Sequence, residues 1–187
     1  MVKRGGGVGF FSDDCPECTL ISKAAGGDCR AFEKLISTHL KVIYNYICIH
    51  VKNEEDVSDI IQETMLAVWN GLKNFRQDSA FRTWVIGITR RKIYDFYREK
   101  YKNTVIPVYE AESALVAGDL SDELTETIDV SNAVLCLSKP EQEIVFLAFG
   151  AQMTYQEISE IVGVPVGTVK SRMHAIKSKL RKRLEKE

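Results

Sequence analysis

The chain has 187 residues, 45% of them hydrophobic, which suffices for one ordinary core or two small helical ones. Its net charge of −1 averages unlike segments and excludes neither nucleic acids nor proteins as partners. No apolar run approaches the roughly 18 residues of a membrane span, and residues 1–11 lack an apolar core for export. We therefore expect a soluble, cytoplasmic protein without membrane insertion.

The N-terminal residues 1–20 are predicted to form a tail that contains a close cysteine pair, Cys15 and Cys18. Such pairs occur in zinc sites and in thiol–disulfide sites. No second close pair follows, so free thiols on the tail are the alternative. The chain has five cysteines, an odd number that favours reduced thiols over a disulfide framework. We assign no metal and no cofactor, and keep Cys15 and Cys18 as zinc or redox candidates.

Residues 21–103 carry apolar side chains at helical spacing and few Pro or Gly residues, which predicts three or four packed helices. Asp28 is placed to cap one helix and Asn53 the next. Asp59, Gln62 and Glu63 then share one face of the helix that follows Asn53. A polar loop at residues 71–81 separates that helix from the last one, at residues 82–102.

Residues 104–131 contain seven acidic residues and no basic one. They show little periodicity, and we predict a linker. In residues 132–187 the charge reverses, because from Lys170 onward eight basic residues face two acidic ones. This concentration suits a polyanion partner, although a solvated helix end is the alternative.

Helix signals in the C-terminal part agree with one another. Capping boxes are predicted at Ser138 and Thr154. Gly163 can supply the positive φ of a tight turn, and Pro165 is expected in the first turn of the next helix. The expected buried face comprises Ile158 and Val162 in the first helix, and Val169, Met173, Ile176 and Leu180 in the second.

This pattern predicts a helix-turn-helix module, whose second helix enters the major groove of duplex DNA. The alternative is a helical hairpin whose basic face is merely exposed to solvent. Four residues face away from the predicted core: Lys170, Ser171, His174 and Lys177. Together with Pro165 and Thr168, which lie near the helix start, they are the candidates for base contact. Basic residues near the C-terminus extend the surface toward phosphates: Lys179, Arg181, Lys182 and Arg183.

Three segments resemble bacterial sigma factors of the sigma-70 family, extracytoplasmic-function (ECF) group. Residues 163–172 (GVPVGTVKSR) resemble region 4. Residues 55–63 (EDVSDIIQE) resemble region 2.2, and residues 74–84 (NFRQDSAFRTW) resemble region 2.3 and the loop after it. The resemblance extends from about Leu20 to Leu184.

The resemblance implies an all-α protein of two small domains, a region 2 helical bundle (21–103) and a region 4 helix-turn-helix domain (132–187), joined by the acidic linker (104–131). It implies core RNA polymerase, promoter DNA and an anti-sigma factor as partners, with no small-molecule substrate, and association with the nucleoid when the chain is in holoenzyme. By resemblance, Asp59, Gln62 and Glu63 contact the polymerase clamp helices, and residues 165–177 read the minus-thirty-five duplex. The residues implied at the melted minus-ten strand are Phe75, Arg76, Gln77, Asp78, Ser79, Ala80, Phe81, Trp84, Arg90, Arg91 and Lys92.

Two positions depart from the family pattern. Arg91 stands where Asn is usual in the pocket for the flipped base, which puts the preferred base in doubt. Ala175 stands where many members have a basic residue, which predicts one missing DNA contact.

Two other classes of protein are weighed against this interpretation. An operator-binding regulator with an N-terminal sensing or dimerisation domain explains the helix-turn-helix pattern but not residues 55–84. A nucleic-acid-processing enzyme lacks any candidate catalytic cluster, since no P-loop, HExxH pair or triad context is present. We therefore expect no enzymatic activity.

Overall fold

A computed structural model of the chain describes residues 15–102 and 132–184, and every regular element in them is a helix. The all-α prediction is confirmed. The first domain, residues 15–102, contains α1 (Pro16–Ala25), α2 (Cys29–Ser37), α3 (Leu40–His50), α4 (Glu54–Gly71), the 3₁₀ turn η1 (Leu72–Asn74) and α5 (Phe81–Lys100). The second domain, residues 132–184, contains α8 (Lys139–Val145), the π-helical turn η2 (Phe146–Gly150), α9 (Tyr155–Val162) and α10 (Val166–Leu184).

The first domain begins its helices where the sequence provides caps. The Asp28 carboxylate accepts the N–H groups of Arg30 and Ala31, and the Asn53 side chain accepts that of Asp56. Each such cap satisfies backbone donors that the helix leaves free, and contributes about 1 kcal/mol. Helices α3, α4 and α5 pack around a core whose fully buried members include Ile43, Tyr46, Ile47, Val68, Leu72 and Phe81.

Helix α1 corrects the prediction of a tail over residues 1–20. It begins at Pro16, a residue that favours the first helical position because its missing N–H has no helical partner there. Ile21 and Ala24 are buried where α1 packs on α2 and η1. Cys15 and Cys18 therefore lie at the N-terminus of a packed helix rather than on a tail outside the helices.

The second domain has the predicted helix-turn-helix layout. Both capping boxes form, at Ser138 with Glu141 and at Thr154 with Glu157. Two details differ from the predictions. Ile161 rather than Val162 is buried beside Ile158 in α9, and α10 begins at Val166, one residue after Pro165. Its buried face comprises Val169, Met173 and Ile176, with Leu180 packed at the edge, as expected.

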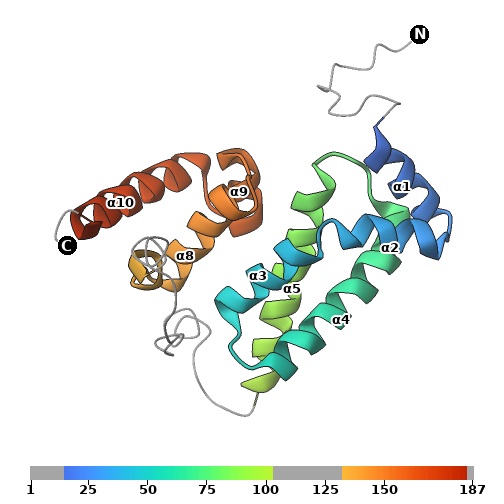
Figure 1. Cartoon of the computed structure of the whole chain (residues 1–187), viewed down its shortest axis with the longest axis horizontal. Helices are drawn as coiled ribbons and strands as arrows, with labels where there is room; N and C mark the ends of the chain where they lie inside the picture. The colour runs from blue at the N-terminus through green and yellow to red at the C-terminus, as the bar shows by residue number, and fades with distance from the viewer. Residues whose placement is uncertain (1–14, 103–131, 185–187) are drawn as a thin grey trace, which may run out of the picture.

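The two domains lie side by side in contact, with α8 against α3 and α9 against α5 (Figure 1). Their buried residues form one continuous apolar cluster, which includes Leu147, Met153 and Ile158 of the second domain. The rings of Tyr46 and Phe146 meet across the boundary at 6.0 Å between centroids. The sequence predicted two domains but not this contact. None of the helices in the described parts of the chain is long and apolar enough to span a membrane.

Candidate nucleic-acid interface

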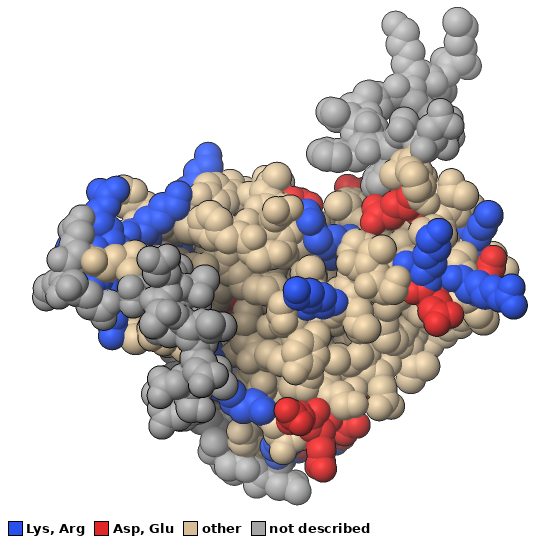
Figure 2. Space-filling model, viewed as in Figure 1, with Lys and Arg blue, Asp and Glu red and all other residues tan. Residues whose placement is uncertain are grey.

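The outer face of α10 is open to solvent along its length. Lys170, Ser171, His174 and Lys177 are exposed, because Val169, Met173 and Ile176 turn the opposite face of the helix into the core. Pro165 is also exposed and Thr168 is half-buried. All six candidates thus lie at the start or on the outer face of one helix, and Figure 2 shows lysine and arginine side chains gathered at the end of the molecule that α10 forms.

The turn before α10 is fixed by a glycine and a serine. Gly163 has φ 76°, a left-handed conformation that costs most other residues about 1 kcal/mol or more. The Ser159 hydroxyl donates to the Val164 carbonyl at 2.6 Å, which holds the turn against α9. The Pro165 carbonyl accepts the N–H groups of Thr168 and Val169, and so begins the helix. This geometry sets the angle at which α10 leaves the domain.

The outer face of α4 presents Asp59, Gln62 and Glu63, all exposed. Leu66 lies on the same face, one turn after Gln62, and is 58% exposed. Leu66 was not predicted from the sequence. Its spacing of three residues from Glu63 and four from Gln62 could have placed it on this face. A single exposed apolar side chain is common on protein surfaces and does not by itself mark a partner surface. Glu63 also pairs with Lys92 of α5 at 2.9 Å, which joins the predicted polymerase face to the predicted minus-ten face.

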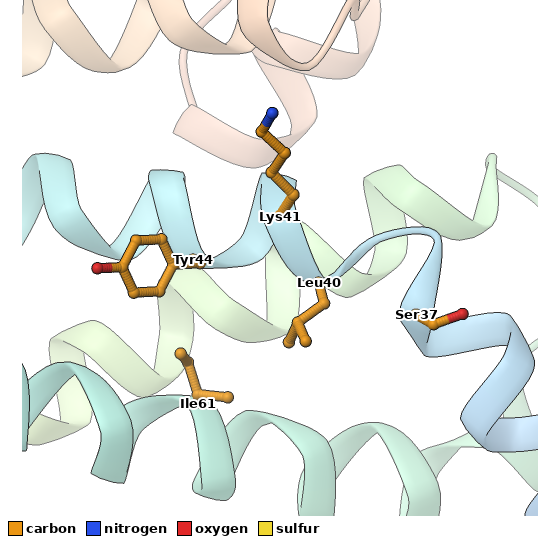
Figure 3. Close-up of a pocket in the computed structure, with 5 residues that line it drawn as sticks. All are labelled: Ser37, Leu40, Lys41, Tyr44 and Ile61. Carbon is orange, nitrogen blue, oxygen red and sulfur yellow. The ribbon is translucent and has the colours of Figure 1, made fainter.

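A shallow hollow lies between α3 and α4, beside the start of α3. It is lined by Ser37, Leu40, Lys41, Tyr44 and Ile61. Figure 3 shows the side chains of Leu40 and Ile61 directed toward one another across the hollow, while Lys41 points away from it.

The segment of residues 75–81 joins η1 to α5 around an aromatic cluster. The ring of Phe75 lies 4.8 Å from that of Trp84 and 5.7 Å from that of Phe81. Phe81 is fully buried, whereas Phe75 and Trp84 are half-buried, so the cluster anchors the segment and leaves two ring edges near the surface. Gln77 has φ 58°, a left-handed backbone conformation that is uncommon outside glycine. Arg76, Gln77 and Asp78 are exposed, and Ser79 and Ala80 are half-buried.

Arg90 is engaged by the second domain. Its Nε donates to the Glu143 carboxylate at 3.0 Å, and the hydroxyl of Tyr46 donates to the same oxygen. Tyr46 is fully buried, and burial together with the charge of Glu143 raises its pKa well above the usual value. Burial lowers the pKa of His50, whose Nε2 lies 3.9 Å from Glu143. Glu143 therefore links α8 to α3 and α5, a role that no sequence signal had indicated.

Three further hydrogen bonds join the domains. Thr83 donates to Glu157 at 2.6 Å, and Arg82 donates to the Gln152 carbonyl at 3.1 Å. Burial opposes ionisation of Glu157, but the hydrogen bonds from Thr83 and Thr154 lower its pKa. Lys139 donates to the carbonyl of Ile49 at 2.7 Å. Among the predicted minus-ten residues, Arg90 is thus turned toward the second domain, while Arg91 stays exposed.

The predicted zinc site gains no further ligand from the structure. Cys15 and Cys18 are free thiols, as are Cys29, Cys48 and Cys136. Within residues 15–102 and 132–184, no three His, Cys, Asp or Glu side chains gather in a way that could hold a metal ion.

The fold and these surfaces define a class: a helical bundle joined to a helix-turn-helix module with a basic recognition helix. Residues 35–102 match the family model of sigma-70 region 2, and residues 128–180 match that of sigma-70 region 4. The chain belongs to the sigma-70 family of RNA polymerase sigma factors, in its ECF group.

Curated relatives agree with this assignment, and solved structures share the fold. RNA polymerase sigma factor YlaC of Bacillus subtilis is 27% identical over 83% of this chain and 93% of its own length. ECF RNA polymerase sigma factor SigW of the same species is 27% identical over 88% and 94%. The fold is similar to that of CnrH in complex with the cytosolic domain of CnrY, with TM-score 0.64 and 24% identity over 91% of this chain and 98% of the other. Sigma factor RpoE in complex with the anti-sigma factor NepR, from Bartonella quintana, also gives TM-score 0.64, at 19% identity over 82% and 96%.

Proposed function

We propose that this sigma factor binds core RNA polymerase through the outer face of α4 and grips a promoter at two points. Helix α10 reads the minus-thirty-five duplex, and the segment of residues 75–81 captures a base of the melted minus-ten strand. The observation that carries the proposal is the solvent-open face of α10, where four polar or basic side chains lie opposite a fully apolar one. A helix of this kind fits the major groove and its phosphates.

The proposed reading of the duplex divides the α10 residues into two sets. Lys170, Ser171 and His174 lie in the first half of the helix, where base edges are reached. Arg181, Lys182 and Arg183 lie at its far end, suited to phosphates, which position the helix without selecting sequence. Ala175 is exposed between the two sets and offers no polar group.

Capture of a flipped base needs a polar rim on a rigid support. The exposed side chains of Arg76, Gln77 and Asp78 supply such a rim, and the cluster of Phe75, Phe81 and Trp84 supplies the support. Arg91 is exposed on α5. It offers a charged guanidinium group at the position where the family usually has the side-chain amide of Asn.

The contact between the domains must open for this two-point grip. The two promoter elements lie about 25 base pairs apart, which is about 85 Å at ~3.4 Å per pair. Two domains in contact cannot reach both elements. The intervening residues 103–131 can extend to at most about 100 Å, which is sufficient. We infer that the closed arrangement belongs to the chain away from promoter DNA, and that an anti-sigma factor is a further partner.

The test is addition of the purified chain to core RNA polymerase with a promoter library. The proposed function predicts specific initiation that depends on the chain. An operator-binding regulator would bind DNA alone and direct no initiation, which would overturn the proposal.

The α4 face has a separate test. Asp59→Ala combined with Gln62→Ala should weaken polymerase binding at least tenfold while DNA binding by α10 stays unchanged. Glu33→Ala is the matched control, because Glu33 is an exposed acidic residue on α2, outside this face. Loss of both activities in the double variant would contradict the assignment of separate surfaces.

A further inference from the structure

Two cysteines lie at the start of α1, in the sequence Cys-Pro-Glu-Cys. Cys15 is the residue before the helix, with extended backbone angles φ −74° and ψ 121°, and Pro16 begins the helix. Cys18 is the third residue of the helix, three positions after Cys15. In a capping box, the side chains of the residue before the helix and of its third residue lie close together. Both cysteines are partly exposed to solvent.

The surroundings give the two thiols different reactivity. The N–H of Cys18, the Cys18 thiol and the N–H of Glu17 lower the pKa of Cys15. Burial and the neighbouring Cys15 thiol raise the pKa of Cys18. Since the thiolate is the nucleophile in disulfide chemistry, Cys15 is suited to attack and Cys18 to close the bond in a second step.

We propose that Cys15 and Cys18 form a reversible thiol–disulfide site whose co-reactant is a low-molecular-weight disulfide. The Cys15 thiolate attacks one sulfur of that disulfide, a mixed disulfide forms on Cys15, and the first small thiolate leaves. Cys18 loses its proton and attacks the Cys15 sulfur, and the second small thiolate leaves. Two protein thiols give up two protons and two electrons, and the small disulfide becomes two thiols.

This site is connected to the segment of residues 75–81. Glu17, between the two cysteines, accepts a hydrogen bond from His39 at 3.0 Å. The His39 ring lies 5.3 Å from that of Phe81, the fully buried residue at which α5 begins. Helix α1 also packs on η1, which leads directly into the segment. A change in the first turn of α1 thus reaches both ends of the segment.

Closing the disulfide draws the two Cβ atoms to about 3.8 Å and fixes the torsion between them. The first turn of α1 must adjust, and Glu17 moves with it. The hydrogen bond to His39 weakens, and the packing of His39 on Phe81 loosens. The oxidised chain therefore holds residues 75–84 less rigidly than the reduced chain.

The first test is a redox titration of the full chain. Cys29, Cys48 and Cys136 are replaced by serine, and the protein is equilibrated in buffers of reduced and oxidised glutathione. Free thiols are then alkylated and counted by mass spectrometry. The expected result is one transition in which both remaining thiols disappear together, and its loss in Cys15→Ser. If both thiols are alkylated at every glutathione ratio, or if glutathione stays attached to Cys15, the proposed site is overturned.

The second test measures hydrogen exchange of residues 75–84 in reduced and oxidised protein. Oxidation should accelerate exchange several-fold, and Glu17→Gln, which keeps both thiols, should give part of the same acceleration in the reduced chain. Equal exchange in both redox forms would overturn the connection to the segment. Neither test uses polymerase or DNA, so failure here is separate from failure of the proposed function.

Discussion

Glu143→Ala is expected to open the contact between the two domains. Glu143 is 7% exposed at its side chain and bonds both Arg90 and Tyr46. Removing one partner of a buried ion pair typically costs about 3–5 kcal/mol, because the other charge stays buried and unpaired. The Arg90 side chain is 21% exposed and regains some water, so we expect the lower end, about 3 kcal/mol. That is about a hundredfold in the ratio of closed to open protein.

The measurement is energy transfer between dyes on Cys29 and Cys136. These thiols are exposed, and they lie in the first and second domain respectively. With the other three cysteines replaced, the parent chain should show one high-transfer state, and Glu143→Ala a substantial low-transfer population. Glu160→Ala is the matched control, since it removes an exposed charge from α9.

A thermodynamic cycle with Arg90→Ala isolates the pair. If Glu143 acts through Arg90, the double variant should open the chain by clearly less than the sum of the two single effects. Transfer that is unchanged in Glu143→Ala, or effects that add within about 0.5 kcal/mol, would refute the reasoning.

Three other predictions concern the turn, pH and DNA. Gly163→Ala should lower the free energy of unfolding by about 1 kcal/mol, because Gly163 has a positive φ. Gly167→Ala should raise it by up to about 1 kcal/mol, because Gly167 lies within α10 and nothing is within 4 Å of the added Cβ. Urea titrations measure both changes. His50 has a lowered pKa, so its contribution to stability is present above pH ~6.5 and is lost as pH falls from there through its folded pKa; His50→Gln should flatten that part of the stability curve. Lys170→Ala should reduce the salt slope of duplex binding by about 1 if Lys170 contacts a phosphate, and an unchanged slope with altered base preference would mean that it contacts a base edge.

Local features of the fold were predictable because their causes are local. The caps at Asp28 and Asn53, both capping boxes and the positive φ of Gly163 depend on residues within a few positions of one another. The buried face of α10 follows from helical spacing alone. Helix α1 was missed because its apolar stripe is short, with only Ile21 and Ala24 buried, and packing on α2 completes it.

The role of Arg90 was not predictable, because it depends on a partner 53 positions away. In the sequence, Glu143 is one acid in a short helix after a capping box, and nothing marks it as buried. Its burial follows from α8 packing on α3. The same holds for Thr83 and Glu157, which meet only because α9 packs on α5. Contacts between domains joined by a long segment leave no periodic trace in either domain.

The closed contact and the proposed promoter grip compete for the same part of α5. Arg82, Thr83 and Arg90 bind the second domain, and they lie on the helix that also carries Trp84 and Arg91. A partner that binds only the open chain must therefore supply the free energy of closure in addition to its own binding free energy. The hydrogen bonds that Arg90, Tyr46 and Thr83 donate across the boundary favour the closed chain, so opening has a free-energy cost. Polymerase and promoter together can offset this cost, whereas DNA binding by one domain alone is lowered in apparent affinity by the fraction of chains that are open. Promoter recognition would then depend on prior assembly with polymerase.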